Sequence, residues 1–178
     1  MQTSGCARGL HVAFAGMWHG RPAGITFRPA APDDADFLRN LYASTRTDEL
    51  RAVPWPEEAK LAFLNDQFRL QDAYYRQAFA DAAFLLILEH GERIGRIYLD
   101  RKPGEIMLID IALIPARRGS GIGSGLLREL LAEAAGSASE VRLHVEPFNA
   151  ALRLYQRLGF TLVERQGVYD LMRWTKAS

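Results

Sequence analysis

The sequence predicts a mixed α/β (or α+β) fold in which helices cover both faces of one central sheet. Apolar residues alternate or form short runs in some segments and recur at helical spacing in others. In chain order these segments predict a strand, two helices, three strands, a helix, a strand, a helix and two strands. The length of 178 residues, 48% of them hydrophobic, suits a single domain with one core.

The chain is expected to begin with a segment outside this domain. Residues 1–24 are rich in glycine and alanine, show no sustained periodicity and contain a second methionine, Met17. These features are typical of a flexible leader or an overlong start. We therefore expect the domain to occupy residues 25–178.

Two helices are expected after the first strand. Residues 25–28 alternate apolar and polar side chains, and Pro29 ends that strand. Asp33 and Asp34 are placed to favour the positive end of a helix dipole, and Pro56 suits the first turn of a second helix. Both helices carry apolar residues at helical spacing, so we expect them to pack on the sheet.

Three strands follow, over residues 84–88, 94–99 and 105–114, joined by turns that contain glycine. The third strand is nearly all apolar, and we expect it to be buried on both faces. Asp110 is the one charged residue inside this strand. It is therefore either buried with a partner or displaced by a β-bulge.

The last third of the chain alternates helices and strands. We expect a helix over residues 126–136, a strand over 141–145, a helix capped by Asn149, and two final strands over 160–163 and 168–172. Because a final strand has a free edge, a homodimer formed by strand pairing across subunits is one expectation.

A glycine-rich loop lies before the helix over residues 126–136. Its glycines are Gly119, Gly121, Gly123 and Gly125. They let the backbone approach a ligand at the positive end of the helix, and a pyrophosphate is the natural guest. The loop lacks the lysine of a P-loop, because Ser124 follows Gly123. It also fails the Gly-x-Gly-x-x-Gly dinucleotide pattern in both frames.

Charge and composition exclude several classes of function. The chain has 22 Lys and Arg against 21 Asp and Glu, so it lacks the positive field that binds nucleic acid. Its longest apolar run near a strand, residues 84–88, falls far short of the ~20 residues of a membrane span. The single cysteine, Cys6, lies in the leader, which favours a reducing, cytoplasmic location and gives no catalytic thiol.

Residues 118–123, Arg-Gly-Ser-Gly-Ile-Gly, resemble the Arg/Gln-x-x-Gly-x-Gly/Ala pyrophosphate motif of the GNAT superfamily of N-acetyltransferases. Residues 111–115, 124–127 and 149–160 are also similar to segments of that family. The resemblance implies a twisted, mixed and mostly antiparallel sheet of six or seven strands with about four helices. It also implies transfer of an acetyl group from acetyl-coenzyme A directly to a primary amine of a small molecule, peptide or protein, without a metal.

The resemblance further implies a set of residues that bind coenzyme A. Backbone groups of Ile111 and Leu113 would bind the pantetheine arm, and the amides of residues 118–124 the pyrophosphate. Tyr155 would lie beside the sulfur and act as general acid toward the leaving thiolate. The full set is Ile111, Ala112, Leu113, Arg118, Gly119, Ser120, Gly121, Ile122, Gly123, Ser124, Asn149 and Tyr155.

The general base is less well indicated. His144 and Glu146 share one face of their strand, and His144 titrates in the right range for a base. By the resemblance, Glu105 opens the strand that sometimes bears a glutamate base, although Met107 is nearest to that position by spacing. A water relay is an alternative.

The acceptor amine is not indicated by the sequence. Glu49, Trp55, Tyr74 and Tyr75, on or between the first two helices, could bind a cation or stack on an acceptor. Two other functions stay open: a coenzyme A-binding module without catalysis, and a Rossmann-type oxidoreductase, for which Glu146 would be the ribose-binding acid.

Overall fold

The computed structural model describes residues 22–176, so residues 1–21 of the expected leader, with Cys6 and Met17, lie outside the described residues. The strands are β1 (Ile25–Pro29), β2 (Ala83–Glu89), β3 (Glu92–Lys102), β4 (Glu105–Leu113), β5 (Glu140–Val145), β6 (Thr161–Gln166) and β7 (Tyr169–Trp174). The helices are α2 (Ala35–Arg51), α3 (Glu57–Ala78), α4 (Ile122–Gly136) and α5 (Leu152–Arg157), with 3-10 turns η1 (Pro32–Asp34) and η2 (Pro115–Arg117). This order of elements agrees with the sequence prediction.

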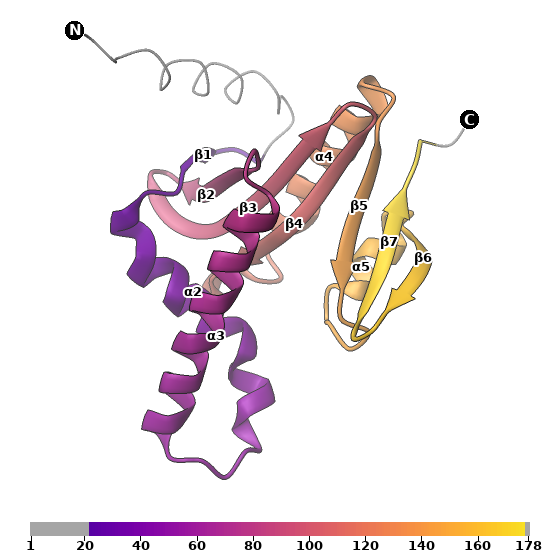
Figure 1. Ribbon diagram of the computed structural model, residues 1–178. Helices are drawn as coiled ribbons and strands as arrows, with labels where there is room; N and C mark the ends of the chain where they lie inside the picture. The colour runs from indigo at the N-terminus through magenta and orange to yellow at the C-terminus, as the bar shows by residue number, and fades with distance from the viewer. Residues whose placement is uncertain (1–21, 177–178) are drawn as a thin grey trace, which may run out of the picture.

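The seven strands form one sheet in the order β1-β2-β3-β4-β5-β7-β6. Every neighbouring pair is antiparallel except β4 and β5, which are parallel. The predicted mixed, mostly antiparallel sheet is therefore confirmed (Figure 1). A Rossmann-type domain needs a parallel sheet, so that alternative is excluded.

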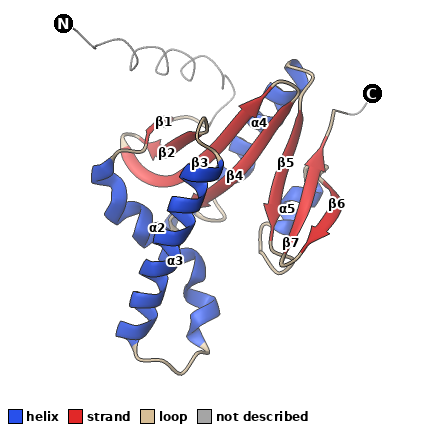
Figure 2. Cartoon of the chain, viewed as in Figure 1, coloured by secondary structure: helices blue, strands red, loops and turns tan. Residues whose placement is uncertain are grey.

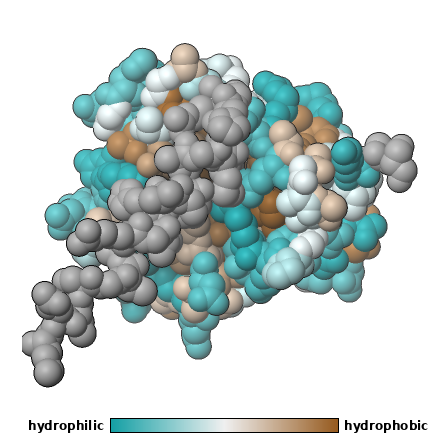
Figure 3. Space-filling model, turned by 90° about the horizontal axis from the view of Figure 1, so that it is seen from above, coloured by the Kyte–Doolittle hydropathy of each residue, from teal (hydrophilic) through white to brown (hydrophobic). Residues whose placement is uncertain are grey.

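Helices cover both faces of the sheet, as predicted. Figure 2 shows α2 and α3 on one face and α4 and α5 on the other. The main core lies under α4, where Leu126 and Leu130 are fully buried against strand residues such as Ile97 and Val141. On the end-on surface drawn in Figure 3, hydrophilic residues predominate around small separate apolar patches. Within residues 22–176, no helix has the length and apolar character to span a membrane.

Strands β4 and β5 are neighbours for only part of their length. Their parallel pairing runs from Glu105 with Glu140 to Leu108 with Leu143, and beyond it the two strands diverge (Figure 1). In the same place β4 carries a β-bulge, because Tyr98 of β3 faces Asp110 while the next residue, Leu99, faces Leu108. We call the opening between the diverging strands the split.

The split explains why one sequence prediction is wrong. We expected residues 105–114 to be buried on both faces, but only Ile106 and Leu108 of β4 are buried. The later residues of the strand are half-buried because β5 no longer lies beside them.

Helix α5 is short and firmly anchored. The Asn149 side chain accepts a hydrogen bond from the Ala151 N–H (2.8 Å) and so shapes the turn that leads into the helix. Gly159 ends the helix with a positive φ of 91°. The Phe160 N–H donates to the Tyr155 carbonyl (3.0 Å), and the two rings make an edge contact at 5.7 Å. These contacts hold Tyr155 against the face of the sheet that α4 covers.

Candidate active site

The site forms where β4 and β5 separate. A strand that loses its neighbour presents backbone N–H and C=O groups along its open edge, and these groups need new partners. In β4 this edge begins after Leu108 and includes Ile111, Ala112 and Leu113, three residues predicted to bind coenzyme A. The split therefore offers a ready-made ladder for an extended polar ligand.

The glycine loop lies directly after this edge and leads into α4. Gly119 and Gly121 have φ values of 74° and 87°, a region that other residues rarely adopt. A Cβ atom added to either glycine would meet no protein atom within 4 Å, so this side of the loop is open. Gly121 is the N-cap of α4, and the positive end of the helix dipole lies at the loop. The loop thus fits a pyrophosphate in backbone conformation, space and polarity.

The side chains of the two loop arginines are engaged elsewhere. Arg118 donates from Nε to the Leu113 carbonyl (2.9 Å) and from Nη2 to the Ser44 hydroxyl (2.7 Å), which fastens the loop to β4 and α2. Arg117 pairs with Glu89 at 2.6 Å. The backbone of Arg118 therefore lies at the open side of the loop, while its side chain holds the loop in place.

Tyr155 belongs to the α4 face of the split. Its side chain is packed in the main core, and the residue is 8% exposed. Burial raises the pKa of the Tyr155 phenol, and the nearby Asp110 carboxylate raises it further. The phenol is therefore a weaker acid than free tyrosine and keeps its proton at neutral pH.

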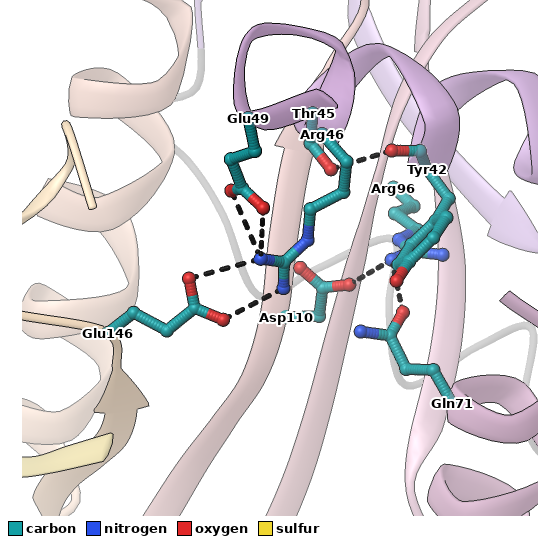
Figure 4. A network of polar contacts seen from close by, with 8 residues as sticks. All are labelled: Tyr42, Thr45, Arg46, Glu49, Gln71, Arg96, Asp110 and Glu146. Carbon is teal, nitrogen blue, oxygen red and sulfur yellow. Dashed lines mark hydrogen bonds and ion pairs between the residues drawn. The ribbon is translucent and has the colours of Figure 1, made fainter. Parts of the chain in front are cut away.

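The α2 and α3 face of the split is polar (Figure 4). Arg46 of α2 donates two hydrogen bonds to Glu146, at 3.1 and 2.9 Å, and also bonds both carboxylate oxygens of Glu49 at 3.1 Å. One guanidinium thus holds two carboxylates and ties α2 to the end of β5. We call this group the Arg46 clasp.

A second charged group lies beside the clasp. Asp110 forms an ion pair with Arg96 of β3, and Arg96 also donates to the Gln71 side chain of α3 (2.9 Å). The side chain of Arg96 is 4% exposed and that of Asp110 is 18% exposed, so Asp110 is the outer member of the pair. Both alternatives expected for Asp110 are found, because it has a buried partner and follows the β-bulge.

The predicted base candidates occupy different positions around the split. Glu146 is held by the clasp, and His144 bonds the exposed Gln166 side chain at 3.1 Å. Glu105 lies before the split, where the strands are still paired, and forms an ion pair with Arg142 at 3.1 Å. Of the three, only Glu146 lies in the network drawn in Figure 4.

The predicted acceptor-side residues are also divided. Glu49 belongs to the clasp. Burial raises the pKa of the Tyr75 phenol, and the charge of the nearby Asp110 raises it further. Trp55 instead packs edge-on against Phe63 at 5.5 Å, and Tyr74 is 61% exposed. The structure therefore places Glu49 and Tyr75 near the acidic groups of the split, Trp55 in the loop between α2 and α3, and Tyr74 on the exposed surface of α3.

Sequence reasoning missed the two arginines that organise this face. Arg46 gives no local signal, because one arginine on an amphipathic helix is usually solvated. Arg96 did leave a signal, since it interrupts the apolar segment 94–99 as Asp110 interrupts 105–114. Opposite charges in two neighbouring apolar strands indicate a buried pair.

Comparisons with known proteins agree with this architecture. The family model described as the acetyltransferase (GNAT) family matches residues 36–160. Among solved structures, the chain is similar to the PaiA N-acetyltransferase of Thermoplasma acidophilum, determined with coenzyme A, at 20% identity and a TM-score of 0.62. The match covers 85% of this chain and 99% of that one. An acetyltransferase from Thermus thermophilus gives 18% identity, a TM-score of 0.62, and coverage of 85% and 97%. These structures share the fold.

Curated relatives are found at higher sequence identity. The mycothiol acetyltransferase of Corynebacterium efficiens is 31% identical over 155 residues, which is 84% of this chain and 50% of the relative. That of Streptomyces griseus is 30% identical over 167 residues, or 88% of this chain and 48% of the relative. This chain spans about half the length of these relatives. On the family match, these relatives and the split sheet, the chain belongs to the acetyltransferase (GNAT) family.

Proposed function

We propose that this chain is an acetyl-coenzyme A-dependent N-acetyltransferase that transfers the acetyl group directly to a primary amine. The observation that carries the proposal is the split, which has a different chemical character on each side. The open glycine loop and Tyr155 belong to the α4 side, and the charged network belongs to the α2 and α3 side. A donor and an acceptor can therefore approach the β4 edge from opposite faces.

The donor side would bind acetyl-coenzyme A in three parts. The amides of residues 118–124 would bind the pyrophosphate, and the β4 edge at Ile111 and Leu113 the pantetheine arm. Asn149 and Tyr155 would lie along that arm, with Tyr155 donating its hydrogen bond to the sulfur. When bound, the coenzyme supplies a thioester whose carbonyl carbon accepts the amine.

The acceptor side would receive the amine in its neutral form. Free amines have pKa values of about 8 for α-amino groups and 10.4 for lysine, so loss of a proton must precede attack. His144, Glu146 and Glu105 are the candidate bases from sequence, and a water relay is the alternative. Glu146 is the candidate nearest the other charged groups of the split.

The proposal is tested by ligand binding followed by turnover. Acetyl-coenzyme A at 100 times its dissociation constant should stabilise the chain by about 2.7 kcal/mol in a thermal shift, whereas NADH should not. Thiol release is then followed with a panel of small-molecule amines, peptide N-termini and lysine peptides. Stabilisation by NADH alone would contradict the proposal. Binding of acetyl-coenzyme A without turnover of any amine would favour the non-catalytic module.

Gly121→Ala should separate cofactor binding from folding. The new Cβ would enter the open side of the loop, so we expect acetyl-coenzyme A to bind at least tenfold more weakly. Gly104→Ala is a matched control, since Gly104 also has a positive φ (77°) and open space but lies in the β3–β4 turn. Each substitution should lower stability by about 1 kcal/mol, measured by urea denaturation. Equal acetyl-coenzyme A affinity, measured by calorimetry, in the two variants would refute the assignment of the loop.

A further inference from the structure

Unpartnered buried polar atoms gather at one place beside the split. Among the described residues, the buried side-chain atoms without a hydrogen bond are Asp72 Oδ1, Arg96 Nε, Tyr98 Oη and Asp110 Oδ2, of which Asp110 Oδ2 has its ion pair with Arg96. All four lie where α3 crosses β3 and β4. Buried polar groups are nearly always hydrogen-bonded, so a cluster of exceptions requires an explanation. Of these four residues, Asp110 is the one whose side chain extends toward the split.

Stability does not explain the Asp110–Arg96 pair. Removing two charges from water is costly, and a buried ion pair is often no better for stability than two apolar side chains. The pair is also incompletely hydrogen-bonded, which weakens its contribution further. Asp110 nevertheless extends toward the split while Arg96 stays buried behind it. This arrangement presents a fixed carboxylate to whatever enters from the α2 and α3 face.

Asp110 influences groups on both sides of the split. Burial is the main cause of the raised pKa of Tyr155 on the α5 side, and the negative charge of Asp110 is the second cause. The same holds for Tyr75 on the α3 side. The Asp110 carboxylate is therefore close to a tyrosine phenol on each face of the sheet.

The other acidic candidate at the split is already engaged. Glu146 uses both carboxylate oxygens to bind Arg46. Asp110 uses Oδ2 for its ion pair, and no hydrogen bond or ion pair within residues 22–176 involves its Oδ1. Asp110 thus has the carboxylate oxygen that an amine can reach.

We propose that Asp110 contacts the acceptor amine and takes the proton that its nitrogen loses on bonding to the acetyl carbon, while Arg96 holds the carboxylate in position. The inference rests on the proposed function, because it assigns a residue to the acceptor half of that same site. Asp110 is then a catalytic residue and Arg96 a positioning residue.

The neutral amine attacks the thioester carbonyl carbon, so that a C–N bond forms and the C–S bond breaks. The nitrogen becomes positively charged as it bonds, and one of its protons passes to Asp110 and then to solvent. The leaving thiolate, which accepts a hydrogen bond from Tyr155, takes a proton from solvent. The products are the N-acetylated amine and coenzyme A in its thiol form.

A carboxylate is a sufficient base for this step. It is far too weak to deprotonate a free ammonium group with a pKa of about 8 to 10. The attacking nitrogen is different, because its bond to the electron-poor carbonyl carbon makes its protons much more acidic. A fixed negative charge also stabilises the positive charge that develops on the nitrogen in the transition state.

The test compares Asp110→Asn and Asp110→Glu with wild type, using glycinamide and tyramine as acceptors. Asp110→Asn should lower kcat for both amines about 100-fold, as expected for loss of a proton acceptor. Acetyl-coenzyme A affinity, measured by calorimetry, should stay within about twofold of wild type. Asp110→Glu keeps the carboxylate but shifts its position, and Arg96→Gln removes the side chain that holds the carboxylate in place. Both variants should therefore have kcat values between those of wild type and Asp110→Asn.

Asp170→Asn is the matched control, because Asp170 is also a partly buried strand carboxylate, located 3.7 Å from Arg165. Its strand partner Val145 belongs to the main core, so Asp170 lies on the opposite face of the sheet. Its substitution should leave kcat within about twofold of wild type.

The outcomes separate the two proposals. A folded Asp110→Asn chain with kcat within threefold of wild type overturns this inference, as does an equal loss in Asp170→Asn. If Asp110→Asn does not fold, Asp110→Glu decides, and unchanged kcat in that variant overturns the inference. Wild-type turnover in either case leaves the proposed function intact. A wild-type chain that binds acetyl-coenzyme A but releases no thiol with any amine of the panel overturns both.

Discussion

Asp34 and Asp110 both form ion pairs with arginine, and they differ in how fully they are bonded. Asp34, in the turn before α2, accepts hydrogen bonds from Arg28 (2.6 and 2.7 Å), from the Ala31 N–H (2.9 Å) and from Arg93 (3.1 Å). Asp110 has the single ion pair with Arg96 and lies among unpartnered atoms. The side chain of Asp34 is 2% exposed, against 18% for Asp110.

The difference indicates different tasks. The four hydrogen bonds of Asp34 join β1, η1 and β3 and offset the loss of hydration, so this centre stabilises the edge of the sheet. Asp110 contributes fewer bonds in a place where the sheet is already open. A fully bonded charge is structural, whereas a partly bonded charge beside an open strand edge is available to a ligand.

The largest expected effect is on stability and follows from Asp34→Asn. Arg28 and Arg93, whose side chains are 38% and 42% exposed, would lose their shared counter-charge, and loss of these charged hydrogen bonds costs about 2–3 kcal/mol. Urea denaturation measures the loss. Thiol release per folded molecule should not change, because Asp34 lies far from the split at the β1 edge. A loss below about 1 kcal/mol would remove the distinction between the two centres.

The pH dependence of stability gives an independent control for Asp34. Hydrogen bonds from Arg28, opposed by burial and assisted by Ala31 and Arg93, lower the pKa of the Asp34 carboxyl well below its ordinary value. Asp34 therefore contributes its stability above the unfolded-state pKa of about 3.9, and the contribution is lost as pH falls further. Wild type should lose stability below about pH 4 more steeply than Asp34→Asn. If the stability of the two proteins falls with pH at the same rate, Asp34 does not have the lowered pKa.

Both centres also show how far the sequence could predict this structure. Hydrophobic periodicity is local, and it was sufficient for the order of the elements and the mixed sheet. The glycine loop was equally local, because its motif and its strand-loop-helix context are adjacent in the sequence. Asp34, by contrast, was expected to favour a helix dipole. Its partner Arg93 lies 59 residues away, and only the sheet register brings them together.

The acceptor side depends on register in the same way. Asp110 was correctly singled out as an anomaly, but its partner could not be named, because the bulge opposite Tyr98 and Leu99 changes the alignment of β3 and β4. The Arg46–Glu146 contact spans 100 residues. The split itself follows from where β4–β5 pairing stops, and no residue pattern in the sequence marks that point.

Two double substitutions test the difference between Asp34 and Asp110, with an expected change in stability of intermediate size. Replacing Arg96 by Met together with Asp110 by Leu removes an incompletely bonded ion pair, so we expect stability to rise by about 1–2 kcal/mol while amine transfer is lost. The matching change at the other centre, Arg28→Met with Asp34→Leu, should destabilise the chain, because Arg93 would be left without its partner. Urea denaturation of both variants measures the change in the free energy of unfolding. A change in the same direction in both variants would contradict the distinction between the two centres.

The smallest expected effect comes from Arg46→Ala. The Arg46 side chain is 27% exposed, and such partly exposed pairs contribute only about 1 kcal/mol or less to stability. Its removal leaves Glu49 and Glu146 without a shared cation at the mouth of the split, so a protonated amine should be drawn to the site more strongly. We expect KM for tyramine to fall about two- to threefold at low ionic strength with kcat unchanged. The gain should disappear near 0.5 M salt, where the screening length is only a few ångströms. Arg46→Lys, which keeps the charge, should behave as wild type. A fall in kcat for Arg46→Ala would instead place Arg46 with Asp110 and Arg96 in the chemistry of the acceptor side.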